Sequence, residues 1–209
     1  MLGGDNYIMS KQVYISADYA VDSGDRDVVE VLQRWGKDDF HRVDFIDMSL
    51  VQSGSVANSP DCRPCDLKGE FNRQINASSA VIFVVGDKTK NRTAGSGCER
   101  NYKSQFECRC TPYKQNVKGT KWCKYSNTYP ATSDNVGSIN TYSYLRHEFE
   151  QAKKAKKKIV ILYNSMRNEY NWLPDYMDGY EYLAHPFWKL NAYGQRIEDY
   201  DYVKRELGF

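Results

Sequence analysis

Two continuous apolar runs constrain the fold of this chain more than any other feature. Residues 80–85 read AVIFVV, and residues 158–163 read KIVILY. Each run has the length of a strand, is rich in β-branched and aromatic residues, and shows no alternation between apolar and polar positions. Strands of this kind are covered on both faces, as in a parallel sheet between two layers of helices. The two runs therefore predict the inner strands of such a sheet.

The segments around these runs alternate between strand and helix patterns. Strand patterns cover residues 12–17 and 42–47, and helical stripes of apolar residues cover residues 27–35, 67–75 and 144–157. This alternation is typical of a doubly wound α/β fold with a flavodoxin-like, mainly parallel sheet. We expect a single domain over residues 11–209. Within it, residues 166–195 should form a structured loop with an edge strand, and residues 199–207 a closing helix.

Charge and hydropathy exclude several classes of protein. The 29 basic and 27 acidic residues leave a net charge of +2, so no basic excess indicates nucleic-acid binding. Five lysines between residues 153 and 158 fall at the end of a predicted helix, where the helix dipole favours them. The apolar runs are too short to span a membrane, and the N-terminus lacks a signal-peptide pattern. We expect a cytoplasmic protein with neither a nucleic-acid nor a membrane partner.

Residues 91–140 interrupt the regular pattern. The segment has no periodicity and is rich in Gly, Ser, Thr, Asn, Lys and Cys. Structureless stretches of about fifty residues are unusual inside a compact domain. We interpret this one as an insertion between the third strand and the third helix. That position lies at the carboxyl-end rim of the sheet, where α/β proteins bind ligands.

The cysteines allow two interpretations. The six are Cys62, Cys65, Cys98, Cys108, Cys110 and Cys123. A CxxC pair followed by clustered cysteines is a pattern of structural zinc sites, and a metal would hold the insertion in shape. The gap from Cys65 to Cys98 is wide for a zinc ribbon, however, and CxC is less usual. Reduced thiols without a metal are the second interpretation, since a disulfide is disfavoured in the cytosol.

Glu148 is the acidic residue with the most suggestive position. It lies early in the predicted helix 144–157, which Thr141 or Ser143 can cap, and that helix begins at the ligand-binding rim. The helix dipole alone also explains an acidic residue there. His147 projects about 100° away from Glu148 around the helix and is expected on the surface.

Four short motifs stand around the predicted sheet. They are VYISADY at 13–19, the strand 81–85 with GDKTKNR at 86–92, YLRHE at 144–148, and IVILYN at 159–164. In this order they resemble the bacterial TIR-like domains, including the TIR component of the Thoeris anti-phage defence system. The resemblance covers residues 11–170 outside the insertion. Its most specific part is the aromatic-x-Arg-x-Glu start of the helix.

The resemblance implies an NAD-cleaving enzyme with Glu148 as its catalytic residue. The family binds ribose and phosphates at the loop after the first strand, and strand ends and the helix start add further candidates. The substrate-binding candidates are Ser16, Ala17, Asp18, Tyr19, Asp47, Tyr144 and Asn164. The resemblance further implies a linear or cyclic ADP-ribose product that signals to a partner effector protein, and self-association on activation. NAD is expected as a substrate and not as a resident cofactor, because the chain has no glycine-rich phosphate loop.

The chemistry of NAD is compatible with a single carboxylate. Nicotinamide leaves as a neutral molecule from a cationic pyridinium, so its departure needs no general acid. A carboxylate beside the ribose can hold its hydroxyl groups and stabilise the oxocarbenium-like transition state.

Three other interpretations fit the same residues. One is a non-catalytic TIR-like module that binds a partner protein. Another is a receiver-like domain that uses Asp18 and Asp47 with magnesium, although Lys88 follows the third strand too soon for the usual pattern. The last is a nucleoside 2-deoxyribosyltransferase-like enzyme, which also depends on a glutamate.

Overall fold

The computed structural model describes residues 11–20, 22–37, 43–47, 63–92 and 143–208. Its main sheet has five strands in the order β2-β1-β3-β4-β5, and every neighbouring pair is parallel. The strands are β1 (Lys11–Ser16), β2 (Val43–Asp47), β3 (Ala80–Val85), β4 (Lys158–Tyr163) and β5 (Ala184–Pro186). The predicted α/β class and mainly parallel sheet are confirmed.

The two apolar runs form the neighbouring strands β3 and β4. Ala80 pairs with Lys158 at one end, and Val85 pairs with Tyr163 at the other. All six residues of β3 are buried, and Lys158 is the one exposed residue of β4. Strands covered on both faces explain why these segments carry no polar alternation.

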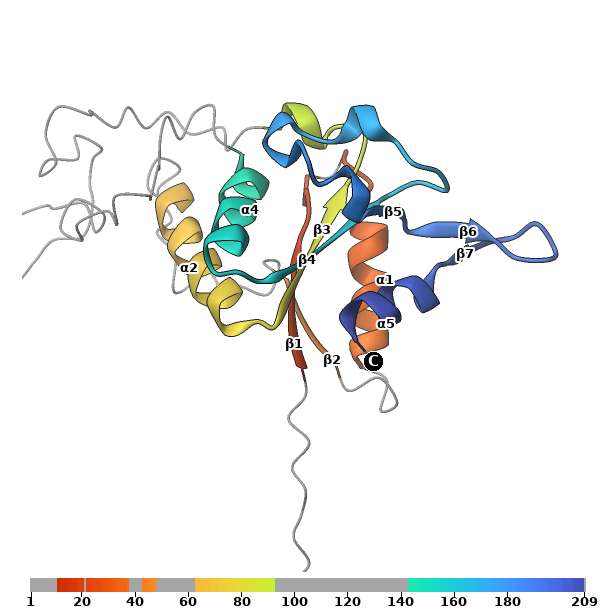
Figure 1. Ribbon diagram of the computed structural model, residues 1–209, viewed down its shortest axis with the longest axis horizontal. Helices are drawn as coiled ribbons and strands as arrows, with labels where there is room; N and C mark the ends of the chain where they lie inside the picture. The colour runs from red at the N-terminus through yellow and green to blue at the C-terminus, as the bar shows by residue number, and fades with distance from the viewer. Residues whose placement is uncertain (1–10, 21, 38–42, 48–62, 93–142, 209) are drawn as a thin grey trace, which may run out of the picture.

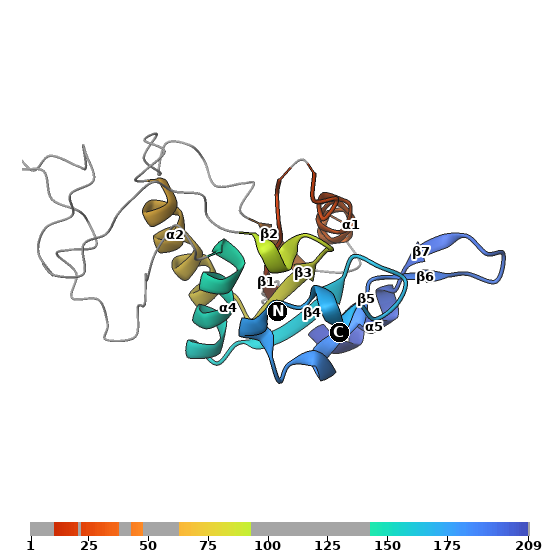
Figure 2. The same cartoon turned by 90° about the horizontal axis from the view of Figure 1, so that it is seen from above.

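Helices cover both faces of the sheet (Figures 1 and 2). They are α1 (Arg26–Gly36), α2 (Arg63–Ala77), α4 (Tyr144–Lys154) and α5 (Tyr200–Leu207). Val13 and Ile15 of β1 pack into the core shared with α1 and α5. Tyr14, between them in sequence, packs into the core shared with α2 and α4. Successive residues of β1 therefore point to opposite faces of the sheet and pack against different helices.

Helix α4 begins where the sequence indicates and ends earlier than predicted. Ser143 is its N-cap and accepts a hydrogen bond from the backbone N–H of Arg146 at 3.0 Å. The helix stops at Lys154 and not at residue 157, because Lys156 takes a left-handed conformation with φ of 51°. That turn reverses the chain so that β4 can begin at Lys158.

The C-terminal part of the chain contains the predicted edge strand and closing helix, and also a hairpin that was not predicted. Three single turns of 3₁₀ helix, η4 (Tyr170–Trp172), η5 (Asp175–Met177) and η6 (Glu181–Leu183), lead to the edge strand β5. A hairpin of β6 (Trp188–Leu190) and β7 (Arg196–Glu198) follows and projects from the body (Figure 1). Among the described residues no helix has the length and apolar character to cross a bilayer.

The strand order fixes where a ligand can bind. The chain leaves β1 towards β2 on one side, whereas β3 connects onward to β4 on the other. The carboxyl ends of β1 and β3 are therefore the topological switch point of the sheet, where a crevice opens between the diverging connections.

The contact between Gly86 and Asp25 yields a test of this packing. A Cβ added at Gly86, directly after β3, would lie 2.4 Å from Asp25 Oδ1. Asp25 is fully buried, and its Oδ1 accepts a hydrogen bond from Asn164 Nδ2 at 3.3 Å, so the carboxylate has little room to retreat. We expect Gly86→Ala to lower the free energy of unfolding by about 1–3 kcal/mol, measured by urea denaturation.

The control removes the obstructing group. In an Asp25→Ala background, Gly86→Ala should destabilise the protein less, because the added methyl no longer meets the carboxylate. An equal loss in both backgrounds would show that another contact sets the requirement for glycine.

Candidate functional site

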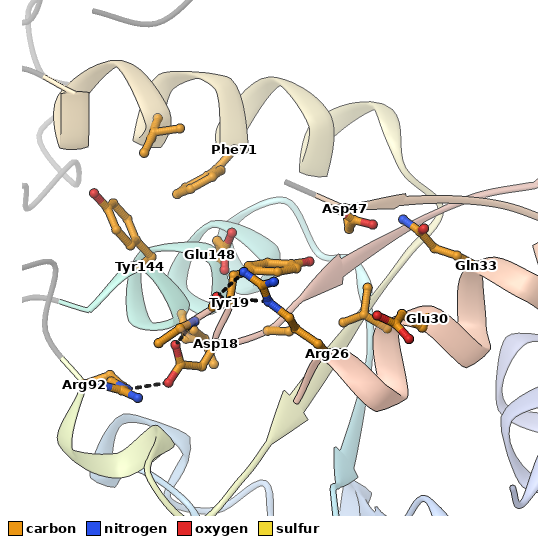
Figure 3. A pocket seen from close by; sticks show the side chains of 15 residues that line it. Asp18, Tyr19, Arg26, Glu30, Gln33, Asp47, Phe71, Arg92, Tyr144 and Glu148 are labelled. Atoms are coloured by element: carbon orange, nitrogen blue, oxygen red, sulfur yellow. Dashed lines mark hydrogen bonds and ion pairs between the residues drawn. The ribbon is translucent and has the colours of Figure 1, made fainter. Parts of the chain in front are cut away.

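A cavity of about 670 Å³ lies at the carboxyl-end rim of the sheet (Figure 3). Its walls come from the loop after β1, the end of β2, one face of α1, part of α2 and the start of α4. Arg92, which follows the 3₁₀ turn η3 (Thr89–Asn91), completes the lining. The cavity thus occupies the crevice that the strand order predicts.

Glu148 is one of three buried acids that line this cavity, together with Asp18 and Asp47. It lies in the second turn of α4 and is only 3% exposed. Tyr14 donates its hydroxyl to Glu148 Oε1 at 2.5 Å, and Ser16 donates its hydroxyl to Oε2. Because Tyr14 and Ser16 are two residues apart on β1, their side chains point to the same face of the sheet. Both carboxylate oxygens therefore accept hydrogen bonds from the same strand, β1.

Burial dominates the electrostatics of Glu148. It raises the pKa of the carboxyl from its ordinary value of 4.5 to about 7, although the hydrogen bonds from Ser16 and Tyr14 act in the opposite direction. Burial and the neighbouring Glu148 carboxylate raise the pKa of Tyr14 well above its ordinary value. Tyr14 therefore keeps its proton as a donor while Glu148 exchanges its own near neutral pH.

Aromatic side chains form the wall next to Glu148. Tyr144 and Phe71 meet edge to face, with ring centroids 5.5 Å apart and an interplanar angle of 86°. Tyr19 and Leu67 add further apolar surface, and Figure 3 shows Tyr19, Phe71 and Tyr144 around the carboxylate. This part of the cavity suits a flat ring more than a flexible polar chain.

The opposite wall is more polar. Arg26, Glu30 and Gln33 project from one face of α1, and Asp47 lies at the end of β2. Arg26 donates through two guanidinium nitrogens to the carbonyl of Tyr19, at 3.2 and 2.9 Å. The side chain is therefore fixed beside the loop that follows β1.

An ion-pair cluster closes one end of the cavity. Arg92 pairs with Asp18 through one nitrogen and with Asp22 through another, and the two carboxylates raise the pKa of the guanidinium. The second oxygen of Asp18 accepts the backbone N–H of Ala20 at 3.0 Å. Asp18 is thus engaged through both oxygens in bonds that shape the loop after β1.

The structure brings most of the predicted site residues together. Lining the cavity with Glu148 are Ala17, Asp18, Tyr19, Asp47 and Tyr144. Ser16 is fully buried beneath the cavity and reaches it through Glu148. Asn164 does not line the cavity. It donates to the carbonyl of Gly24 at 3.0 Å and accepts from Trp188 Nε1 at 2.8 Å, so it fastens the end of β4 to the start of α1.

Some site residues were not predicted from the sequence. Tyr14 and Arg92 lie in motifs that carry the resemblance but were not named as site residues, and Arg26 was not singled out. The expectation that His147 is a surface residue is wrong. It is 8% exposed, and its Nε2 lies 2.9 Å from Asn72 Oδ1 because α2 packs alongside α4.

The metal prediction concerns residues that the structure does not describe. Five of the six cysteines lie outside the described ranges, and Cys65 is placed only as part of the backbone of α2. Within the described ranges no three His, Cys, Asp or Glu side chains are grouped to hold a metal ion. The zinc site, and with it most of the insertion at 91–140, stays a prediction.

The buried carboxyl gives the protein a characteristic pH dependence. Between pH 4.5 and 7 folded Glu148 holds a proton that the unfolded chain has lost, so its contribution to stability falls as pH rises through this window. A glutamine at this position has no proton to lose and stays neutral. We therefore expect Glu148→Gln to raise the free energy of unfolding at pH 8 by on the order of 2–3 kcal/mol, with little change at pH 4.

Denaturant melts of both proteins from pH 4 to 8 measure this difference. Asp25, whose pKa burial also raises to about 7, should keep part of the slope in the variant. A stability gap that does not change with pH would contradict a raised pKa at Glu148.

No protein-family model and no curated protein matches this sequence. The chemistry of the cavity and the arrangement of the residues that line it are therefore the basis for assigning a function.

Proposed function

We propose that the protein is a TIR-like enzyme that breaks the nicotinamide–ribose bond of NAD. The observation that carries the proposal is the carboxylate of Glu148, which is buried in the cavity at the switch point of the sheet and held by Tyr14 and Ser16. In the reaction the C–N bond breaks, its electron pair stays with nicotinamide, and the ribose carbon becomes electron-poor. Water, or for a cyclic product a nucleophilic atom of the same molecule, then bonds to that carbon and releases a proton to solvent. A fixed anion beside that carbon stabilises the transition state.

The two hydroxyl donors support this role. A free carboxylate would rotate, whereas Tyr14 and Ser16 hold one oxygen each and fix the plane of the group. Their bonds also make the ionised form less unfavourable despite its burial. Glu148 is thereby available as an anion at neutral pH without an arginine or lysine partner among the described residues. Such a partner would neutralise the charge that the reaction needs.

The aromatic wall supports a pyridinium substrate. An oxidised nicotinamide ring is flat and cationic, and such rings are attracted to the faces of aromatic side chains. Tyr19, Phe71 and Tyr144 lie next to the carboxylate in the same cavity. The site thus combines aromatic surface for the leaving group with an anion for the ribose, as cleavage of this bond requires.

The strand order supports the finer fold assignment. The order β2-β1-β3-β4-β5 is that of flavodoxin-like sheets. Within that fold we propose that the domain is TIR-like. With the sequence resemblance, this leads us to propose a cytoplasmic enzyme of bacterial anti-phage defence. Its product would be a linear or cyclic ADP-ribose signal that a partner effector senses, and its activation would involve self-association.

Replacing Glu148 tests the assignment. We expect purified protein to release nicotinamide from NAD, and Glu148→Gln to reduce that rate at least about a hundredfold while the fold is retained. Chromatographic measurement of nicotinamide and ADP-ribose products, with protein from infected and uninfected cells, provides the readout.

The matched control is Glu150→Gln. Glu150 lies on the same helix, pairs with Lys153 at 3.5 Å and does not line the cavity, so its replacement should leave the rate unchanged. Equal turnover by wild type and Glu148→Gln would refute the assignment. Release of a base from deoxynucleosides instead of NAD would favour the transferase alternative, and no release at all would favour the interaction module.

The tyrosine partner is tested through the pH profile. Nicotinamide release should rise with pH as Glu148 ionises, with a midpoint near its pKa of about 7. The hydrogen bond from Tyr14 lowers that pKa, so Tyr14→Phe should move the midpoint to higher pH as well as slow the reaction.

A second buried tyrosine serves as the control. Tyr163 lies on the same face of the sheet, and its hydroxyl makes no hydrogen bond with the described residues. Tyr163→Phe should leave the midpoint in place. A midpoint that moves equally in both variants would mean that Tyr14 acts through general packing and not through its bond to Glu148.

A further inference from the structure

The two arginines of the cavity differ in their partners. Arg92 is engaged by the carboxylates of Asp18 and Asp22. Arg26 donates only to a neutral acceptor, the carbonyl of Tyr19, and makes no ion pair with any residue that the structure describes. No carboxylate of the described residues therefore lies within ion-pair distance of Arg26, although its side chain is fixed at the cavity wall (Figure 3).

A guanidinium in this situation is suited to a phosphate. Its planar fork of donors matches phosphate oxygens, and one bonded carbonyl leaves further N–H groups to donate. Arg26 is also the first residue of the eleven-residue helix α1, whose N-terminal end favours negative charge. Both effects act at the same point of the cavity wall.

The rest of the α1 wall shows how far a ligand can extend. Arg26, Glu30 and Gln33 line the cavity from successive turns of the helix, over a length of about 10 Å. The Nε2 atom of Gln33 is buried and makes no hydrogen bond within the described part of the chain. Asp47 lies at the same end and offers acceptor oxygens (Figure 3). A donor and an acceptor together suit the edge of a nucleobase.

The groups that could bind a ligand therefore follow one another along the length of the cavity. The aromatic wall and Glu148 form one end, Arg26 follows, and Gln33 with Asp47 forms the other end. A molecule with a ring, a ribose, a charged linker and a second base has the same order of groups. A nucleoside alone would leave Arg26 and the far end of the α1 wall without a ligand group.

We propose that Arg26 binds the diphosphate of the substrate, so that the cavity selects a dinucleotide over the corresponding nucleoside. This inference rests on the proposed function for the position of the reactive ribose. It assigns the linker to a side chain of α1 and not to the Asp18–Arg92 pair, whose charges are already balanced. Gln33 and Asp47, beyond Arg26, then face the second nucleoside.

A comparison of two substrates distinguishes diphosphate binding by Arg26 from a general effect of Arg26 on the structure of the cavity. NAD carries the diphosphate, and nicotinamide riboside has the same scissile bond without it. We expect Arg26→Gln to lower kcat/KM for NAD about 10- to 100-fold, because the variant loses one charge-assisted hydrogen bond. The same substitution should change kcat/KM for the riboside less than about twofold. Arg26→Lys, which keeps the charge but loses the planar fork, should lie between wild type and Arg26→Gln.

Arg34→Gln is the matched control. Arg34 lies on the same helix, pairs with Glu198 at 2.5 Å and does not line the cavity, so its replacement should alter neither substrate. Thermal unfolding confirms that each variant is folded. An equal loss on both substrates, or no loss on NAD, would overturn the role of Arg26 while leaving the cleavage reaction intact.

A binding experiment keeps the inference separate from the proposed activity. Calorimetric titration of wild type and Arg26→Gln with ADP and with adenosine does not depend on turnover. Weaker ADP binding with unchanged adenosine binding supports the diphosphate site, even for a protein that releases no nicotinamide. ADP that binds both proteins equally, or binds neither, contradicts it.

Discussion

The contact between β1 and α4 is the interaction on which the site depends. A carboxylate that is 3% exposed and has no cationic partner in the described structure is tolerated because Tyr14 and Ser16 each give it a hydrogen bond. This requires a particular register. If β1 were displaced by one residue, Val13 and Ile15 would face α4, and Glu148 would meet only apolar groups. The parallel pairing of β1 with both β2 and β3 fixes that register.

The same contact sets the protonation state of the site. A fully solvated glutamate would be ionised throughout the physiological range and would form part of a hydrated surface. An apolar pocket without donors would keep the group protonated. Burial together with two neutral donors places the pKa of Glu148 at about 7, where both forms are accessible. Stability and the proposed chemistry thus oppose each other at this residue, because the negative charge that the proposed reaction would use is the charge that folding disfavours.

The sequence was sufficient to predict the framework and the catalytic candidate. The β-branched runs identified β3 and β4, and the order of elements placed the start of α4 at the ligand rim. The role of Tyr14 was not predictable, because its partner lies 134 residues away and a buried tyrosine in a strand reads as core. Asn164 was expected near a ligand as a strand-end residue, but β4 lies on the far side of β3 from the cavity.

The layout of the acids favours a glycosidic reaction over phosphate transfer. A receiver-like site needs carboxylates that converge on a cation with free oxygens. Here Asp18 has one oxygen bonded to Arg92 and the other to the backbone of Ala20, and so it is used to shape the loop. Asp47 lies towards the α1 wall, whereas Glu148 is held by the hydroxyl groups of Tyr14 and Ser16 beside the aromatic rings. All three acids are buried, but they differ in their partners. Asp18 is bonded to an arginine and the backbone, whereas Glu148 is held by two neutral hydroxyl groups beside Tyr144 and Phe71, which suits the proposed reaction.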